Sequence, residues 1–341
     1  MKQIIVFISI SVFFFFVSCN QDDMPEVSNP DSQFVIKFQT EPLLLTHGFF
    51  DEDTKAESWE NELNSLQVFI FEGDKSQIIS TFYFSESELQ SGEKYISMDE
   101  EYLGKNLTFY AYGNAGKLDP VSLPNLVSSA RSRHIGTYNG TFNDVLQGEI
   151  FDSGFEMSAI TKATKSNDGS ITEVPLRLER ITNKIAIKTK LSDTFREFYD
   201  GGDLRINSVN IDNGCSLSYL TDQTSALNGS RSAVRQEPVY KDGYYQNLLY
   251  AFETSGSQLT ISIDATFDED GDFSTTHDQK EVTYTFKTMA GYKNSYLKKS
   301  GRNEYYRINV IIQGLPENIQ SLAIVEENWK DAVDEDNSLG N

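Results

Sequence analysis

Apolar and polar residues alternate with a period of two along most of the chain beyond Gln33. Side chains two positions apart share one face of a strand, so this alternation predicts β-strands with one buried face. Such strands are typical of antiparallel sandwiches with one wetted face. The clearest run is 259–267, and the others are 34–38, 78–84, 107–112, 185–187, 282–286 and 306–312.

Residues 66–71 depart from this pattern because they are apolar on both faces. Leu66, Val68 and Ile70 share one side, and Phe69 and Phe71 make the other side apolar too. We expect a central strand that is covered on both faces.

Helical periodicity is scarce, and only 123–145 and 193–199 are expected to hold short helices between strands. The polar stretch 162–173 separates two patterned regions. We therefore expect a division near Ile171 into an N-terminal β-sandwich domain, 33–170, and a C-terminal one, 171–341.

The amino-terminal residues indicate that the chain is exported. An apolar run from Ile4 to Val17 follows one positive charge and leads directly to Ser18 and Cys19. This run fits a signal-peptide core and is shorter than the roughly 20 residues of a membrane-spanning helix. We expect a signal peptide at 1–18 and a polar tether at 19–32, whose composition buries no core.

Composition excludes some functions and supports export. Only two cysteines occur, Cys19 and Cys215, and if Cys19 carries lipid then Cys215 has no disulfide partner. The formal net charge is −22, which repels nucleic acid, so we expect no nucleic-acid partner.

Candidate chemistry is sparse. His47, His134 and His277 lie far apart, without ligands at metal spacing, and no nucleophile elbow or zinc-protease motif occurs. We expect no enzyme, no cofactor and no metal. The acidic run 268–272 allows two readings, a calcium loop or a hairpin turn, and the turn is favoured because the run separates two alternating strands.

Phe16-Val17-Ser18-Cys19 resembles a bacterial lipobox, with Phe16 where Leu is usual, and the acidic residues that follow resemble the surface-export tag of Bacteroidetes lipoproteins. Four further stretches resemble, in order, the fimbrillins of Bacteroidales, which are the lipoprotein precursors of type V pili. They are Glu62 to Gly73, Lys105 to Ala115, Val174 to Ile185 with Asn183 where Ala is usual, and Arg302 to Val310 with the later Asn328-Trp329.

This resemblance implies a mostly β protein with two transthyretin-like antiparallel β-sandwich domains, lipidated at Cys19 and polymerised by strand exchange. A trypsin-like protease would cut at Lys55-Ala56, where the family's usual Arg is missing. Cleavage would remove the N-terminal strand, whose Phe34, Ile36 and Phe38 fill a hydrophobic groove.

A neighbour's C-terminal strand, with Leu322 and Ile324, would refill that groove. An equally open reading makes this segment a resident strand of its own domain.

The implied function is a fimbrial subunit that supports cell adhesion. It would sit in the outer membrane as a surface lipoprotein and in the fimbrium after processing, and its partners would be other fimbrial subunits, the membrane lipid and the processing protease. Two alternatives stay open: an uncleaved, lipid-anchored fimbrial anchor subunit, and a surface glycan-binding lipoprotein with exposed aromatics in a row on one sheet face.

Overall fold

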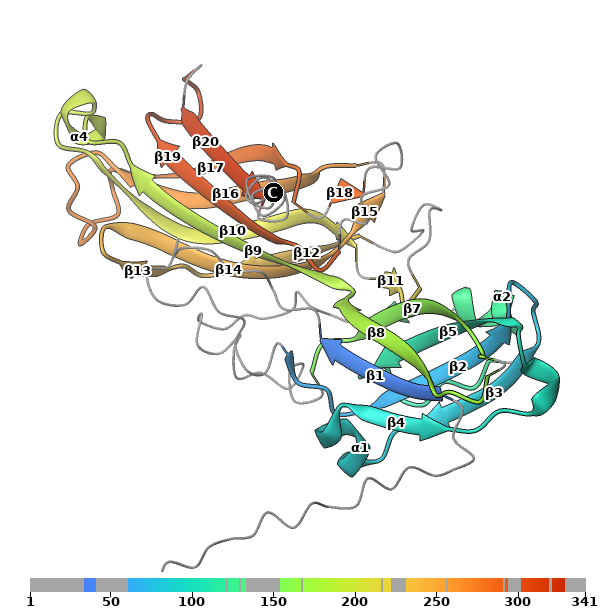
Figure 1. Cartoon of the computed structure of the whole chain (residues 1–341). Coiled ribbons are helices and arrows are strands. Elements are labelled where there is room, and N and C mark those ends of the chain that lie inside the picture. Colours follow the sequence, from blue (N-terminus) through green and yellow to red (C-terminus); the bar gives the residue numbers. More distant parts are fainter. Residues whose placement is uncertain are drawn as a thin grey trace, which may run out of the picture.

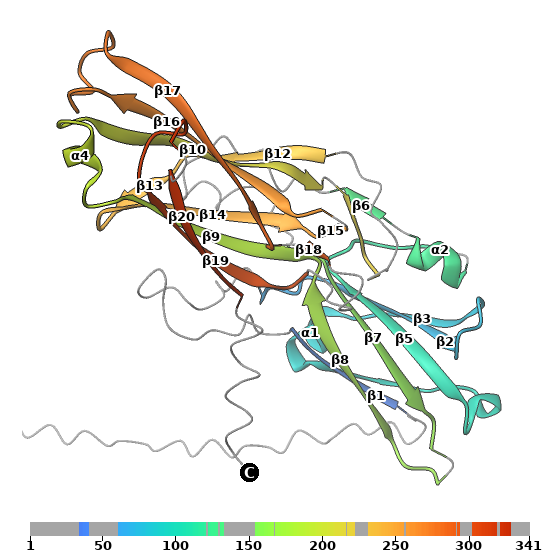
Figure 2. The same ribbon diagram turned by 90° about the horizontal axis from the view of Figure 1, so that it is seen from above.

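A computed structural model describes residues 34–40, 61–120, 122–128, 130–132, 154–166, 168–215, 217–221, 231–255, 257–290, 292–293, 302–318 and 321–328. The described chain is mostly β, as predicted, and its strands form two sandwich units that lie end to end in Figures 1 and 2. No helix among these residues is long and apolar enough to cross a membrane.

The first unit is built from eight strands and short helical turns. Its elements are β1 (Phe34–Thr40), β2 (Leu66–Glu72), β3 (Ile78–Tyr83), α1 (Glu86–Ser91), β4 (Glu93–Ile96), the 3-10 turn η2 (Glu100–Tyr102), β5 (Asn106–Gly113), α2 (Leu123–Val127), β6 (Ala130–Ser132), β7 (Met157–Thr164) and β8 (Thr172–Arg180). The main strands follow the order β3-β2-β5-β7-β8-β1-β4. Strands β7 and β8 pair only at Met157 with Arg180 and Ser158 with Glu179, and the sheet folds over there into two layers around the first core.

The prediction for 66–71 is confirmed. Strand β2 lies between β3 and β5, and all six residues are buried. The segment that leads to α2 covers its second face, where the Gln67 side chain donates to the Leu118 carbonyl and accepts from the Leu118 amide, both at 2.9 Å.

The second unit encloses a separate core between a four-stranded sheet, β12-β10-β16-β17, and a five-stranded sheet, β13-β14-β9-β19-β20. Its elements are β9 (Thr182–Leu191), α4 (Phe195–Phe198), β10 (Asp203–Cys215), β11 (Leu217–Tyr219), β12 (Arg231–Gln236), β13 (Val239–Lys241), β14 (Tyr244–Phe252), β15 (Thr254–Ser255), β16 (Leu259–Asp268), β17 (Gln279–Thr288), β18 (Tyr292–Lys293), β19 (Tyr305–Ile312) and β20 (Leu322–Asn328). The run 259–267 lies within β16 and faces the core as predicted, and α2 and α4 occupy the two regions expected to be helical.

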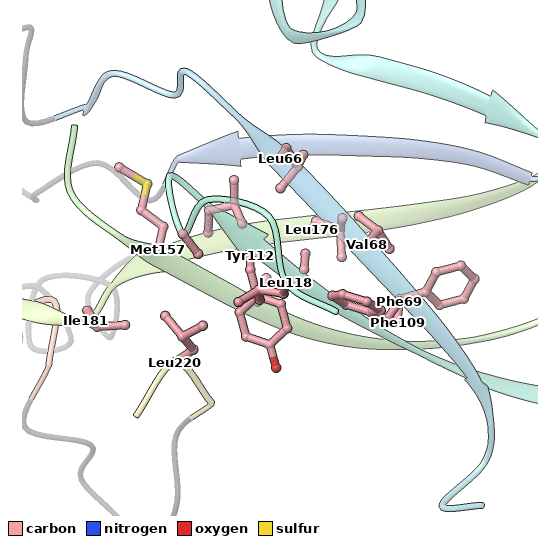
Figure 3. Close-up of a cluster of buried hydrophobic side chains, with 14 of the residues drawn as sticks. Leu66, Val68, Phe69, Phe109, Tyr112, Leu118, Met157, Leu176, Ile181 and Leu220 are labelled. Atoms are coloured by element: carbon pink, nitrogen blue, oxygen red, sulfur yellow. The ribbon is translucent and has the colours of Figure 1, made fainter. Parts of the chain in front are cut away.

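The two units meet without a linker, because Ile181 alone separates β8 from β9. We propose that the domains divide at Ile181, beyond the division expected near Ile171. Buried side chains of the second unit, among them Tyr250 and Phe252, belong to the first core. Strand β11 pairs with β6 of the first unit, and Figure 3 shows Leu220 and Ile181 at the Tyr112 end of that core.

A buried ion pair holds this junction from the second unit. The Arg302 guanidinium and the Glu253 carboxylate are each 1% exposed and bonded to one another. Arg302 also donates to the Tyr219 carbonyl at 2.8 Å, and the Tyr112 and Thr221 hydroxyls lie 2.5 Å apart. Burial raises the pKa of the Tyr112 hydroxyl, and its hydrogen bond to Thr221 offsets part of that rise.

Candidate functional site

Strand β1 lies inside the sheet of the first unit. It runs parallel to β8, from Phe34 opposite Thr172 to Thr40 opposite Leu178, and antiparallel to β4 on its other side. Figure 1 shows the blue strand between these two neighbours. The amide of Phe38 donates to the carbonyl of Gly92 at 3.0 Å, just past β4's pairing. Loss of β1 would therefore leave two sheet edges unpaired.

The inward side chains of β1 fill the first core. Phe34 and Ile36 are completely buried, and Phe38 packs against the same cluster. The rings of Phe34 and Phe109 stand 5.7 Å apart, edge to face, and those of Phe38 and Phe84 stand 5.4 Å apart. These three predicted residues thus share one face, and that face packs into the first core.

The opposite face of β1 carries one buried apolar residue, Val35, and two exposed polar residues, Lys37 and Gln39. Lys37 Nζ lies 2.8 Å from a carboxylate oxygen of Glu173 on β8, and both side chains are about half exposed. The hydrogen bond to Glu173 raises the pKa of Lys37. An exposed pair of this kind contributes little to stability, so apolar burial dominates the hold on β1.

Strand β20 is held much more loosely. Among the described strands it pairs with β19 alone, from Leu322 opposite Ile312 to Asn328 opposite Tyr306. Leu322 packs partly against the second core, whereas Ile324 is 38% exposed and Val325 is 54% exposed. In this structure the segment is a resident edge strand, and few apolar contacts would be lost if it detached.

Alternate residues of β20 match the inward-facing residues of β1 in apolar character at two of three positions. The inward face of β1 carries large apolar groups at Phe34, Ile36 and Phe38. A strand that placed Leu322 and Ile324 at the first two of these positions would bring Glu326 to the third.

Asn114 fixes the start of β2, a role that sequence reasoning missed. Its Oδ1 accepts from the backbone amide of Asn64 at 2.8 Å, and its Nδ2 donates to the carbonyls of Glu62 at 2.7 Å and Phe155 at 2.9 Å. Arg180 adds a bond to Asn61 and donates to Asn303 Oδ1 at 2.9 Å. Residues 61–65 are therefore held independently of β1.

A sequence signal for Asn114 does exist. It follows Gly113 at the end of β5, and its φ is +55°, a conformation in which asparagine is enriched among residues other than glycine. The predicted strand ending in Gly-Asn is thus confirmed as a strand, and its Asn joins the end of β5 to the segment before β2.

Several predicted site residues lie outside the described residues. They are Cys19, the cleavage pair Lys55 and Ala56, and Trp329. Of the three histidines, His277 is described and is 79% exposed, in keeping with an incidental surface residue.

No protein-family model matches the chain, and no curated protein sequence matches it. Solved structures do share its fold. A candidate cell adhesion protein from Parabacteroides distasonis ATCC 8503 aligns at a TM-score of 0.58 with 13% identity, over 88% of this chain and 97% of that one. A second candidate cell adhesion protein, from Bacteroides eggerthii DSM 20697, aligns at 0.53 with 13% identity, over 88% and 96%.

The tip fimbrial protein Mfa3 from Porphyromonas gingivalis is also matched, at a TM-score of 0.48 and 14% identity, over 80% of this chain and 96% of that one. The two closer alignments show that the fold of this chain occurs in bacterial proteins described as candidates for cell adhesion.

Proposed function

We propose that this chain is a non-enzymatic structural subunit of a type V fimbrium, exported as a surface lipoprotein through Cys19 and polymerised by donor-strand exchange. The observation that carries the proposal is the position of β1. A single N-terminal strand, joined to β2 by residues 41–65, which contain Lys55, supplies two completely buried side chains and the pairing for two neighbours.

Removal of such a strand creates a surface that only another strand can cover well. The edges of β8 and β4 would present unpaired backbone groups, and the side chains that pack on Phe34 and Ile36 would face water. Exposed edges and apolar grooves of this kind are satisfied by an added strand from another chain. Because Asn114 and Arg180 hold residues 61–65, a cut at Lys55-Ala56 would leave the start of β2 in place.

The donor would come from the C-terminal end of a second copy or of a different subunit. The single-sided pairing and exposed apolar side chains of β20 support a strand that leaves its own sheet at low cost. Such a donor would place Glu326 at the position of Phe38, which is only partly buried in β1.

The processing step has a direct test. Surface-sheared, assembled protein should begin near Ala56 on amino-terminal sequencing, and Lys55→Gln should leave a lipidated monomer. Lys37→Gln serves as the matched control, because Lys37 is also an exposed lysine of the N-terminal region and should be processed normally. Assembled protein that begins at Cys19 would instead identify an uncleaved anchor subunit.

The described surface does not favour the glycan-binding alternative. Its well-exposed aromatic residues, Tyr83, Tyr95, Phe198 and Tyr240, come from β3, β4, α4 and β13. They form no row along one sheet face, which is the arrangement expected of a stacking platform for sugars.

A further inference from the structure

The loop that joins β16 to β17 gathers acidic side chains from both of its ends. The two strands pair antiparallel, from Leu259 opposite Thr288 to Asp268 opposite Gln279, so the predicted hairpin is confirmed. Closure of this hairpin brings Asp278 beside Asp268 and Asp270. One carboxylate oxygen of each lies within 4.8 Å of the others.

Asp268 is the buried member of this cluster. It lies on the polar face of β16, and its side chain is completely covered. Its Oδ2 accepts a hydrogen bond from Gln279 Nε2 at 3.1 Å, but its Oδ1 is buried with no hydrogen-bond partner. A buried carboxylate oxygen without a donor is costly, because water no longer solvates its charge.

Side chains around the cluster do little to neutralise it. Lys280 on β17 pairs with Glu317, and Arg205 on β10 stacks on Phe273 with its guanidinium 4.9 Å from the ring centroid. Arg196 on α4 pairs with Asp203 at the start of β10. Within the described residues the contact from a basic group is that of His277, whose Nδ1 lies 3.5 Å from Asp278 and whose ring is exposed.

The loop is also held close to a second segment. Gly271 has a φ of +76°, and a Cβ there would lie 2.9 Å from the carbonyl oxygen of Gly201, just before β10. A side chain at this position would push the loop away, so glycine lets the acidic tip dock against the turn after α4.

We propose that Asp268, Asp270 and Asp278 bind one divalent cation, and that calcium is the metal that fits them. All three ligands are hard carboxylate oxygens, with no sulfur and one exposed imidazole nearby, which disfavours zinc. Calcium accepts six to eight oxygens in flexible geometry, including carbonyls and waters, whereas magnesium demands a strict octahedron. The cation supplies the missing partner of Asp268 Oδ1 and joins both ends of the loop. The proposal is independent of the fimbrial function.

Thermal unfolding of the full chain tests it. After chelator treatment, added CaCl2 should raise the melting temperature by about 3 °C for each tenfold increase above the dissociation constant. Magnesium at equal ionic strength should have a smaller effect. Half-saturation is expected at about 0.1–1 mM, the range of extracellular calcium modules. No calcium-dependent shift, or equal shifts with both metals, would overturn the proposal.

Substitutions separate a bound ion from general screening of an acidic chain. Asp270→Asn and Asp278→Asn should each raise the melting temperature in chelator, because they relieve like-charge repulsion, and should abolish the calcium shift. Asp272→Asn removes the same charge from the same loop outside the cluster and should keep the shift. An equal calcium response in Asp270→Asn and Asp272→Asn would refute a specific site. Destabilisation by Asp270→Asn with an unchanged calcium shift would also refute it.

Discussion

The contrast between the tightly held β1 and the loosely held β20 can be measured with one substitution made twice. Ile36 in β1 is completely buried in the first core, and Ile324 in β20 is 38% exposed at a sheet edge. Ile36→Ala and Ile324→Ala delete the same atoms from two strands, so the difference between them reports the local packing.

Ile36→Ala should lower the free energy of unfolding far more than Ile324→Ala. Three carbon groups at about 0.8 kcal/mol each, plus a cavity that the sandwich cannot close, give about 3.5 kcal/mol for Ile36→Ala. At Ile324 only about 60% of that apolar surface leaves water, and solvent fills the space left behind. The expected loss there is about 1.5 kcal/mol or less.

Urea denaturation of the uncleaved chain, followed by far-UV circular dichroism, provides the assay. With a slope of about 2 kcal/mol/M, Ile36→Ala should lower the midpoint of one transition by roughly 1.7 M and Ile324→Ala by less than half of that. The two domains are free to unfold in separate transitions, so each is fitted on its own. Equal shifts for the two variants would refute the view that β1 is the strand that fills a groove and β20 the one that detaches easily.

Three further predictions concern Asn114 and the buried contact between the two units. Asn114→Asp keeps the acceptor for backbone amides but loses both donated bonds, and it should lower the free energy of unfolding by about 2–3 kcal/mol in the same urea assay. Glu253→Gln leaves the Arg302 charge buried without its counter-ion and should cost about 3–5 kcal/mol, whereas the double variant with Arg302→Met should recover most of that loss. Burial raises the pKa of Tyr112, so its hydroxyl stays protonated in the folded state, whereas the same hydroxyl ionises at about pH 10 in the unfolded chain. The stability that Tyr112 contributes is therefore fully present below that pH and is lost above it. Tyr112→Phe should make the decline in the free energy of unfolding between about pH 9 and pH 11 shallower.

Alternation predicted strands wherever one face of a regular strand meets the core and the other meets water, as in β16. It missed β10 because bulges between Ile206 and Ser208 and between Ile211 and Gly214 break the period of two. It missed β14 because the side chains of Leu248 and Tyr250 pack on the first core while Leu249 packs on the second, which leaves no polar face.

The candidate sites differ in the same way in how far the sequence predicts them. Phe34, Ile36 and Phe38 could be predicted as one buried face, because their spacing alone places them together. The meeting of Asp278 with Asp268 could not be predicted, since it depends on how the hairpin closes. The reach of Asn114 to the start of β2 likewise depends on two segments that approach only in the folded sheet.

The passage from β8 to β9 through Ile181 alone has a consequence for any assembly of such subunits. Two consecutive strands anchored in different sandwiches, with one buried residue between them, would restrict rotation between the two units at this connection. Bending of a polymer would then concentrate at the contacts between subunits. Its persistence length would be set by how tightly each donated strand is seated, and the molecule itself would serve as a stiff rod segment.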